Sequence, residues 1–312
     1  MPWLFNLVLQ SASEIKLYDT NVSVKELTSS SVLLEKELQI LIERNMLTFF
    51  GVRFLKSEYA ITGGRMDSIG IDENNCPVIF EYKRSSNENV INQGLFYLDW
   101  LLDHKADFQL LVMNVLGKDI ADKIDWSAPC VICVAHKFNK YDVHAVDRMQ
   151  ANIKLVEYRM YNNGMLLFEH LNMPSSMPPV QKEASLTAKS KTQKMDTNEH
   201  LKKLETLSPE LQEVYSELCG YIETLGDEVA SNQLKQYLAY RKVKNFACIE
   251  LFSRHIKVFL DIDPATVKIE KDFTRDVSNV GHHATGNIEV VIRTQEDLER
   301  AKPLIERAYN EG

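Results

Sequence analysis

The sequence predicts an α/β region followed by a smaller α+β region, and three observations lead to this fold class. The chain has 312 residues, which suits about two domains. Runs that are apolar on both faces, such as CVICVA, alternate with amphipathic segments in the first half. Residues 173–197 combine three prolines and four lysines with few large apolar side chains, as a linker does. We therefore expect domains at 1–172 and 198–312, joined by a flexible linker at 173–197.

The first region reads as helix, hairpin, helix, strand, helix, strand. The first helix is expected from about Ser31 to Asn45, capped by Ser30 or Ser31, with Leu34, Leu38 and Leu41 on one buried stripe. A strand at 52–62 precedes the hairpin, and the second helix is expected at 85–104, capped by Ser85 or Ser86. The remaining expected elements are interior strands FQLLVMNV and CVICVA, a helix GKDIADKIDW between them, and two strands around an Asn-Asn-Gly turn in 153–171.

The C-terminal region is expected to form a two-layer α+β unit. A helix begins at Ser208-Pro209, alternating strands occupy 235–263, and a final helix is capped around Thr294. Residues 240–246, YRKVKNF, interleave basic and aromatic residues. This heptad fits either a solvated entry to a strand or a nucleic-acid surface.

Charge and composition limit the classes of function. The net charge of −8 disfavours a generic polyanion binder, so contact with nucleic acid requires a local positive patch or a bound cation. No apolar run approaches the roughly 20 residues that span a bilayer. The first ten residues, MPWLFNLVLQ, do not resemble a secretory signal, and we expect a cytoplasmic protein that does not enter membranes. Cys130 and Cys133 form a CxxC, but they alternate across one strand, which predicts two buried thiols rather than a metal site.

The segment GGRMDSIGIDENNCPVIFEYKR, residues 63–84, brings like charges together on one expected hairpin. If the turn is Glu73-Asn74-Asn75, with Asn75 left-handed, Asp67 lies directly opposite Glu81. Facing β-carbons are only about 4.5–5.5 Å apart, where like charges repel. Lys83 follows on the same face as Glu81, whereas Tyr82 points away.

Three arrangements make such a pair tolerable. One carboxyl stays protonated because its neighbour raises its pKa. Alternatively, a divalent cation binds between the two carboxylates and replaces repulsion with coordination. The third arrangement is a solvated cluster of charges at the end of a strand, which is a common surface feature. Spacing alone leaves these alternatives open.

Asp67 followed by Glu81-Tyr82-Lys83 resembles the D…(D/E)xK signature of the PD-(D/E)XK nuclease superfamily. The segment GRMDSIGID…PVIFEYKR with INQGLFYLDWL resembles the catalytic domain of NucS/EndoMS-type endonucleases, and it also resembles uncharacterised proteins that join this domain to a C-terminal domain of unknown function, some labelled predicted transport proteins. The similarity covers about residues 31–170 and is most specific at 63–102. Met66 stands where the superfamily has its leading proline. The resemblance implies a restriction-endonuclease-like mixed sheet flanked by helices.

The resemblance also implies roles for individual residues. Asp67 and Glu81 would bind Mg²⁺ or Mn²⁺ together with the main-chain carbonyl of Tyr82, and Lys83 would act on the attacking water. The family's glutamate on the preceding helix matches Glu35, although a helical wheel places Glu37 nearer the apolar face.

Four further residues are candidates for the border of the site. Gln93 and Tyr97 share one side of a helix at i, i+4 spacing, and the resemblance places a glutamine there beside the site. An ordinary polar face with Tyr97 partly in the core is the alternative. Arg65 and Arg84 flank the hairpin and are candidates for gripping phosphates, with solvated arginines as the alternative.

The expected function is therefore a divalent-metal-dependent DNA endonuclease. Single-stranded, branched and mismatched DNA are candidate substrates, and a homodimer is an open alternative for its assembly. The alternative function is an inactive nuclease-fold adaptor that binds nucleic acid or protein.

Overall fold

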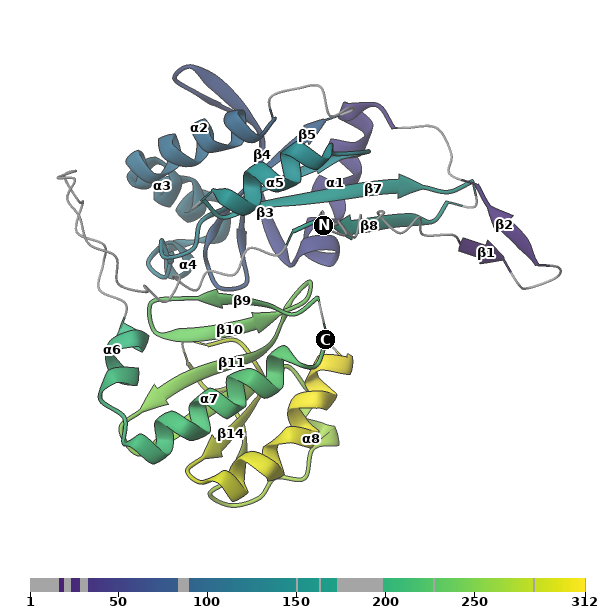
Figure 1. Ribbon diagram of the computed structural model, residues 1–312. Coiled ribbons are helices and arrows are strands. Elements are labelled where there is room, and N and C mark those ends of the chain that lie inside the picture. The colour runs from purple at the N-terminus through teal and green to yellow at the C-terminus, as the bar shows by residue number, and fades with distance from the viewer. Residues whose placement is uncertain are drawn as a thin grey trace, which may run out of the picture.

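The protein is described from a computed structural model. The described residues are 17–19, 24–28, 33–83, 90–149, 151–162, 164–172, 199–226, 228–282 and 284–311. They form two six-stranded sheets with their helices and a small two-stranded ribbon, as Figure 1 shows. The ribbon pairs β1 (Leu17–Asp19) with β2 (Lys25–Leu27).

The first sheet is mixed and has the order β3-β4-β5-β6-β7-β8. Neighbours pair antiparallel from β3 to β5, parallel from β5 to β7, and antiparallel between β7 and β8. This is a mixed sheet, as the resemblance implies. The strands are β3 (Val52–Ile61), β4 (Gly64–Asp72), β5 (Pro77–Lys83), β6 (Cys130–Ala135), β7 (Ile153–Met160) and β8 (Leu166–His170).

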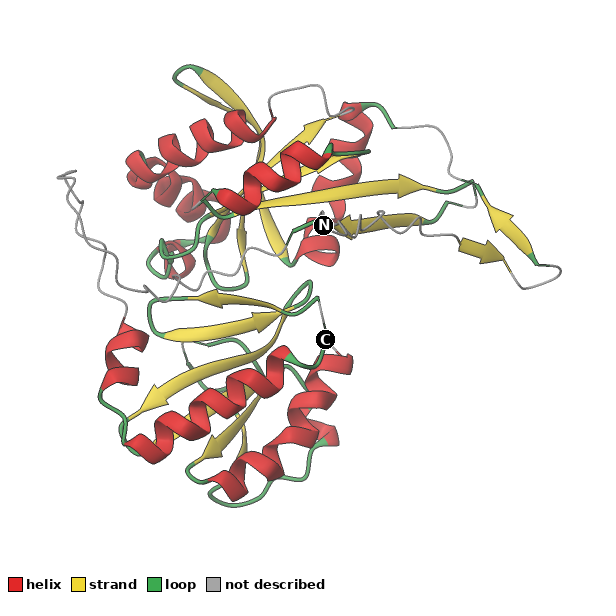
Figure 2. Ribbon diagram, in the orientation of Figure 1, coloured by secondary structure: helices red, strands yellow, loops and turns green. Residues whose placement is uncertain are grey.

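Helices cover both faces of this sheet (Figure 2). α1 (Glu35–Phe50) packs against the face that carries Phe80 and Tyr82. The opposite face packs against α2 (Val90–Asp103), α3 (Lys105–Leu116) and residues of α5 (Lys140–Arg148). The short α4 (Lys118–Ala121) follows α3. Cys130 and Cys133 are buried in the clusters on opposite faces, which confirms the prediction for the CxxC.

The prediction that FQLLVMNV forms an interior strand is wrong. These residues lie within α3, where Phe108 and Val112 are buried while Leu110 and Met113 are exposed. Buried side chains four residues apart fit a helix, but a short apolar run does not by itself separate helix from strand. The helix expected at 117–126 shrinks accordingly to the single turn of α4.

The limits and buried face of α1 also differ from the prediction. The helix begins at Glu35 and continues to Phe50, and Leu34 at its N-cap is exposed. The buried stripe runs at i, i+4 spacing through Leu38, Ile42 and Met46. The expected caps Ser30, Ser31, Ser85 and Ser86 lie outside the described residues.

The second sheet is antiparallel throughout, in the order β13-β14-β12-β11-β10-β9. One face packs against α7 (Pro209–Glu223) and α8 (Gln295–Glu311). The side chain of Ser208 caps α7, as the sequence predicts. The other elements are α6 (Glu199–Glu205), a 3₁₀ turn (Pro264–Thr266), and the strands β9 (Ala230–Gln233), β10 (Tyr237–Arg241), β11 (Asn245–Phe252), β12 (His255–Leu260), β13 (Thr274–Asp276) and β14 (Ile288–Ile292).

The chain thus contains an α/β unit followed by an α+β unit, which confirms the predicted fold class. The expected linker at 173–197 lies outside the described residues, so the domain limits stay a prediction. No helix within the described part of the chain is long and apolar enough to cross a membrane.

Candidate metal-dependent active site

The hairpin formed by β4 and β5 has the predicted register. Ile69 pairs with Ile79, and the main-chain N–H of Asp72 donates to the carbonyl of Cys76 over 2.9 Å. Asn75 adopts a left-handed conformation, with φ of 60°, which asparagine tolerates better than most residues. This turn fixes which residues of the two strands face each other.

Asp67 and Glu81 meet across this hairpin. The main-chain N–H of Asp67 lies 3.3 Å from Glu81 Oε1, and the main-chain N–H of Tyr82 donates to Asp67 Oδ2 over 2.9 Å. Glu81 is fully buried, and its Oε2 has no hydrogen-bond partner among the described residues. A buried carboxylate oxygen without a partner is costly, so this atom is a candidate ligand for a cation.

Burial and nearby like charges disfavour the charged forms of both carboxyls. Burial and the nearby charge of Asp67 raise the pKa of Glu81 to about 8. Burial also raises the pKa of Asp67, while the hydrogen bond from Tyr82 and the charge of Lys83 oppose that rise. A cation bound between the two would reverse this balance by stabilising both carboxylates.

Lys83 and Glu35 lie at the same end of the hairpin. Lys83 Nζ is 3.9 Å from Glu35 Oε1, and only 11% of the lysine side chain is exposed. Glu35 also lies near enough to Glu81 to raise the pKa of that carboxyl. Glu37 instead accepts a hydrogen bond from the main-chain N–H of Leu34 at the start of α1. Of the two glutamates, the structure brings Glu35 toward the hairpin, whereas Glu37 caps the helix.

The side chain of Tyr82 points away from the carboxylates, as its position in the strand predicts. It belongs to the apolar cluster under α1, and its hydroxyl donates to Ser68 Oγ over 3.1 Å. Its proposed contribution to a metal site is the main-chain carbonyl, so a buried side chain is compatible with that role.

Gln93 and Tyr97 are linked as their spacing suggests, with Gln93 Nε2 donating to the Tyr97 hydroxyl over 2.9 Å. That hydroxyl also lies 3.3 Å from the main-chain N–H of Arg65. Tyr97 is only 3% exposed and belongs to the core, which disfavours the predicted direct contact with DNA. The Arg65 side chain is 64% exposed and pairs with Glu58 over 2.6 Å. Arg84 lies outside the described residues.

Two residues that sequence reasoning missed lie beside Asp67. Gln39 on α1 is buried and donates to the Asp67 carbonyl over 2.8 Å. Glu58 lies opposite Asp67 on β3, between the pairs Ser57–Ser68 and Tyr59–Met66, and its charge raises the pKa of Asp67. Its φ of 52° is unusual inside a strand. A polar residue beside the apolar stripe of α1 is a weak signal for Gln39, but the sequence around Glu58 reads as ordinary strand.

Side chains supply only part of a ligand set for a divalent cation at this site. In the part of the chain that the structure describes, no group of three or more His, Cys, Asp or Glu side chains is placed to hold a metal ion. Two carboxylates with a main-chain carbonyl are nevertheless a sufficient protein contribution for Mg²⁺, which usually keeps several waters and also binds substrate phosphates. The unpartnered Glu81 Oε2 beside Asp67 is the observation that favours this fit.

The C-terminal unit matches a known domain family. Residues 199–312 match the family described as "Domain of unknown function (DUF5655)". A protein from Haemophilus influenzae described as "Uncharacterized protein" is 28% identical to this chain over 296 residues. That alignment covers 92% of this chain and 97% of the relative, so it spans residues of both units of this chain.

Three solved structures show limited similarity. A repair endonuclease from Pyrococcus abyssi has 18% identity and a TM-score of 0.27, over 42% of this chain and 50% of that chain. EndoMS in its apo form has 20% identity and a TM-score of 0.27, over 43% and 49%. An EndoMS–dsDNA2 complex has 21% identity and a TM-score of 0.25, over 43% and 50%. The chain spans about half the length of these proteins, and TM-scores this low do not establish a shared fold or activity.

Proposed function

We propose that the protein is a divalent-metal-dependent DNA endonuclease that hydrolyses phosphodiester bonds. The observation that carries the proposal is the buried Glu81 Oε2, which has no partner in the described structure and adjoins Asp67 on the facing strand. The D…ExK spacing of Asp67, Glu81 and Lys83, which resembles the PD-(D/E)XK signature, supports the same conclusion.

Asp67, Glu81 and the Tyr82 carbonyl would hold Mg²⁺ or Mn²⁺. The cation supplies charge neutralisation at the phosphate and lowers the pKa of water. The chain itself fixes both carboxylates, because the hairpin register and the hydrogen bond from the Tyr82 N–H set their positions before substrate arrives.

Lys83 is proposed to orient and help deprotonate the attacking water. Its partly buried ammonium lies 3.9 Å from Glu35, which restrains the amine at the end of β5. Gln93 is proposed to border the scissile phosphate, and Arg65 and Arg84 to grip phosphates beside it. Arg65 would need to exchange its pairing with Glu58 for a phosphate oxygen.

Cleavage of labelled oligonucleotides tests this proposal. Single-stranded, branched and mismatched DNA is incubated with Mg²⁺, with Mn²⁺ or with EDTA. The variants Asp67→Ala, Glu81→Ala and Lys83→Ala should stay folded by circular dichroism and lose at least about 100-fold of the metal-dependent rate. Asp276→Ala, which removes an exposed carboxylate of the second unit, should cleave as the wild type does. Wild-type rates in all three hairpin variants would reject the assignment.

Calorimetric titration separates binding from turnover. Mn²⁺ should bind the wild type, and Glu81→Gln should lose most of that affinity because it removes one anionic ligand. DNA binding with neither metal binding nor cleavage would instead favour the inactive adaptor.

A further inference from the structure

The turn between β4 and β5 is held by side chains of the second unit. The Tyr237 hydroxyl donates to Asn74 Oδ1 over 3.0 Å, and the amide group of Asn245 donates to the same oxygen. The main-chain N–H of Asn245 also donates to Glu73 Oε1 over 2.6 Å. Two consecutive residues of the turn are thus bound by two strands, β10 and β11, that lie more than 160 positions further along the chain.

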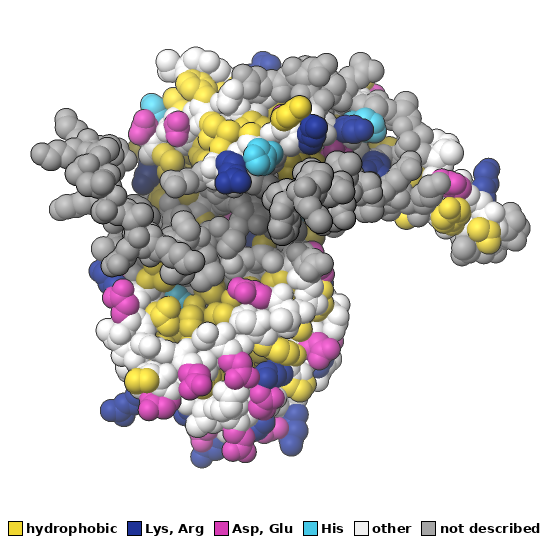
Figure 3. Space-filling view, viewed as in Figure 1, with side chains coloured by type: hydrophobic (Ala, Val, Ile, Leu, Met, Phe, Trp, Pro, Cys, Tyr) yellow, Lys and Arg dark blue, Asp and Glu magenta, His cyan; other side chains and the backbone are white. Residues whose placement is uncertain are grey.

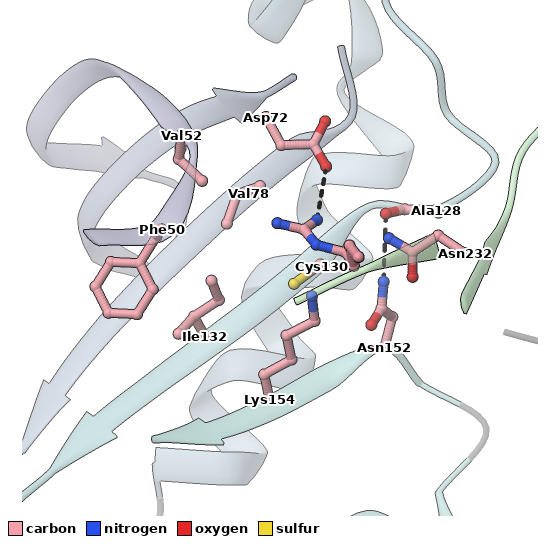
Figure 4. Close-up of a pocket in the computed structure, with 11 residues that line it drawn as sticks. Phe50, Val52, Asp72, Val78, Ala128, Cys130, Ile132, Asn152, Lys154 and Asn232 are labelled. Atoms are coloured by element: carbon pink, nitrogen blue, oxygen red, sulfur yellow. Dashed lines mark hydrogen bonds and ion pairs between the residues drawn. The ribbon is translucent and has the colours of Figure 1, made fainter. Parts of the chain in front are cut away.

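An ion pair extends this contact to a third residue of the turn. Arg241 Nη1 lies 3.5 Å from Asp72 Oδ2, and both side chains are less than a tenth exposed. Figure 4 shows the carboxylate of Asp72 at one side of a small cavity between the two sheets, with Lys154 and Asn232 also lining it. Arg241 belongs to the heptad YRKVKNF, whose aromatic residues Tyr240 and Phe246 are also buried. These buried aromatic rings are not available to stack on bases, whereas Val243 and Lys244 in the turn between β10 and β11 are exposed, so the solvated alternative fits that turn alone.

Apolar packing surrounds these polar contacts. Side chains of β10 alternate, so that Leu238 and Tyr240 pack under α7 and α8 while Tyr237 and Ala239 face the first unit. Tyr237 and Ala239 belong to an apolar cluster that also contains Cys76, the residue that follows the turn. The second sheet is therefore covered by its own helices on one face, and in part on the other face by Cys76 and Ala128 of the first unit together with Val277 and Ala284 of its own loops. Its contact with the turn is shielded from water, where a lost hydrogen bond is not readily replaced.

The turn connects directly to the proposed active site. From the pair Ile71–Pro77 next to the turn, the ladder runs without interruption to the pair Ser68–Phe80. Asp67 and Glu81 are the next residues of the two strands. Displacement of the turn would shift both strands together, because a paired ribbon moves as one body more readily than it breaks its ladder.

We propose that the second unit, which matches DUF5655, acts as a platform that holds the β4–β5 turn, and that Tyr237, Asn245 and Arg241 are positioning residues for Asp67 and Glu81. The claim rests on the proposed function for its catalytic consequence. Its structural half, that these contacts immobilise the hairpin, is independent of any activity. The role of the second unit within this protein would thus be to hold the β4–β5 hairpin in place.

Hydrogen exchange of the full-length protein tests the structural half. Tyr237→Phe removes only the hydroxyl that bonds Asn74, and exchange of the hairpin amides should accelerate about 3- to 10-fold. Tyr215→Phe is a matched control, because the Tyr215 hydroxyl is also buried and lies 3.1 Å from His200 Nε2, within the second unit. It should leave hairpin exchange unchanged. Equal hairpin exchange in the wild type and Tyr237→Phe would overturn the proposal.

A double-mutant cycle and kinetics complete the test. Unfolding of Asn74→Ala, Tyr237→Phe and the double variant should be non-additive, because the two residues share one hydrogen bond. For DNA cleavage, Tyr237→Phe should lower kcat and leave KM near the wild-type value, since the loss is of geometry and not of DNA contacts. Faster hairpin exchange with unchanged kcat would overturn the positioning role. Absence of cleavage in the wild type would instead refute the proposed function, while the exchange result would still decide whether the platform holds the hairpin.

Discussion

At the scale of single residues, the molecule places carboxyl groups where their charged form is disfavoured. Glu81 is one such residue in the hairpin, and Glu73 is another at the contact between the two units. Burial raises the pKa of Glu73 to about 7, although Arg241 and the N–H of Asn245 oppose the rise. The neighbouring carboxyls of Asp72 and Asp261 push the pKa in the same direction as burial.

The raised pKa of Glu73 predicts a specific dependence of stability on pH. Between about pH 4.5 and 7 the folded protein keeps this proton while the unfolded chain has lost it, so the free energy of unfolding falls as pH rises. Glu73→Gln cannot lose a proton and should remove this decline, which totals about 3 kcal/mol across that pH range. Urea unfolding at a series of pH values measures it. Parallel pH profiles for the two proteins would contradict the assignment.

The residues around Asp67 show what sequence can and cannot predict about the site. The position of the turn predicts that Asp67 faces Glu81. Asn75 suits the left-handed conformation in that turn, and counting outward from the turn along both strands then gives each pair of facing residues. Glu58 was not foreseeable in this way. It belongs to β3, whose register against β4 shifts near Phe54, and a local pattern does not reveal such a shift.

At the scale of elements, the hairpin is packed tightly against β3. Gly70 pairs with Phe54, and a β-carbon added at Gly70 would lie 2.5 Å from Val52 Cγ1 and 2.8 Å from the Arg53 carbonyl oxygen. The second contact is with main chain, which cannot rotate aside. The close approach of β3 and β4 therefore requires glycine at this position.

Gly70→Ala should consequently destabilise the protein by about 1–3 kcal/mol, the usual cost of forcing extra volume into a packed region. Gly220→Ala is the matched control, because Gly220 lies in α7 and an added β-carbon meets nothing within 4 Å. That substitution should stabilise the protein by about 0.5–1 kcal/mol through helix propensity. Thermal or urea unfolding of both variants checks the two signs, and equal effects would contradict the packing argument.

Elements were predictable where a local signal marked them. Ser208-Pro209 correctly marked the start of α7, and alternation correctly marked β10 to β12. The segment FQLLVMNV had no such mark, because its short apolar run is compatible with either period. Helix α3 was settled by packing of Phe108 and Val112 against the sheet, which depends on residues distant in the chain.

At the scale of the whole molecule, the contact between the two units was the least predictable feature. It joins Asn74 to Tyr237 and Asp72 to Arg241, and no periodicity relates positions so far apart. On the face shown in Figure 3, acidic side chains of the second unit are interspersed with Lys and Arg side chains.

The ion pair between the units should contribute far more to stability than a surface pair. Arg241→Ala would leave Asp72 buried without its partner, which typically costs about 3–5 kcal/mol. Arg300→Ala is the control, because Arg300 pairs with Glu270 at a distance of 2.8 Å on the surface, where a loss of about 1 kcal/mol or less is expected. Calorimetry measures both. A similar, small loss in the two variants would show that the units are not held together through Arg241.

The packing contact between the two units also determines whether this protein can be divided into stable fragments. A fragment that stops before residue 199 would present Cys76 and Ala128 to water and would strand the carboxylate of Asp72 without its guanidinium. The remaining fragment would expose Tyr237, whose hydroxyl would lose Asn74. The separate fragments should therefore aggregate and fold poorly. Their failure to cleave DNA would say nothing about the activity of the intact chain.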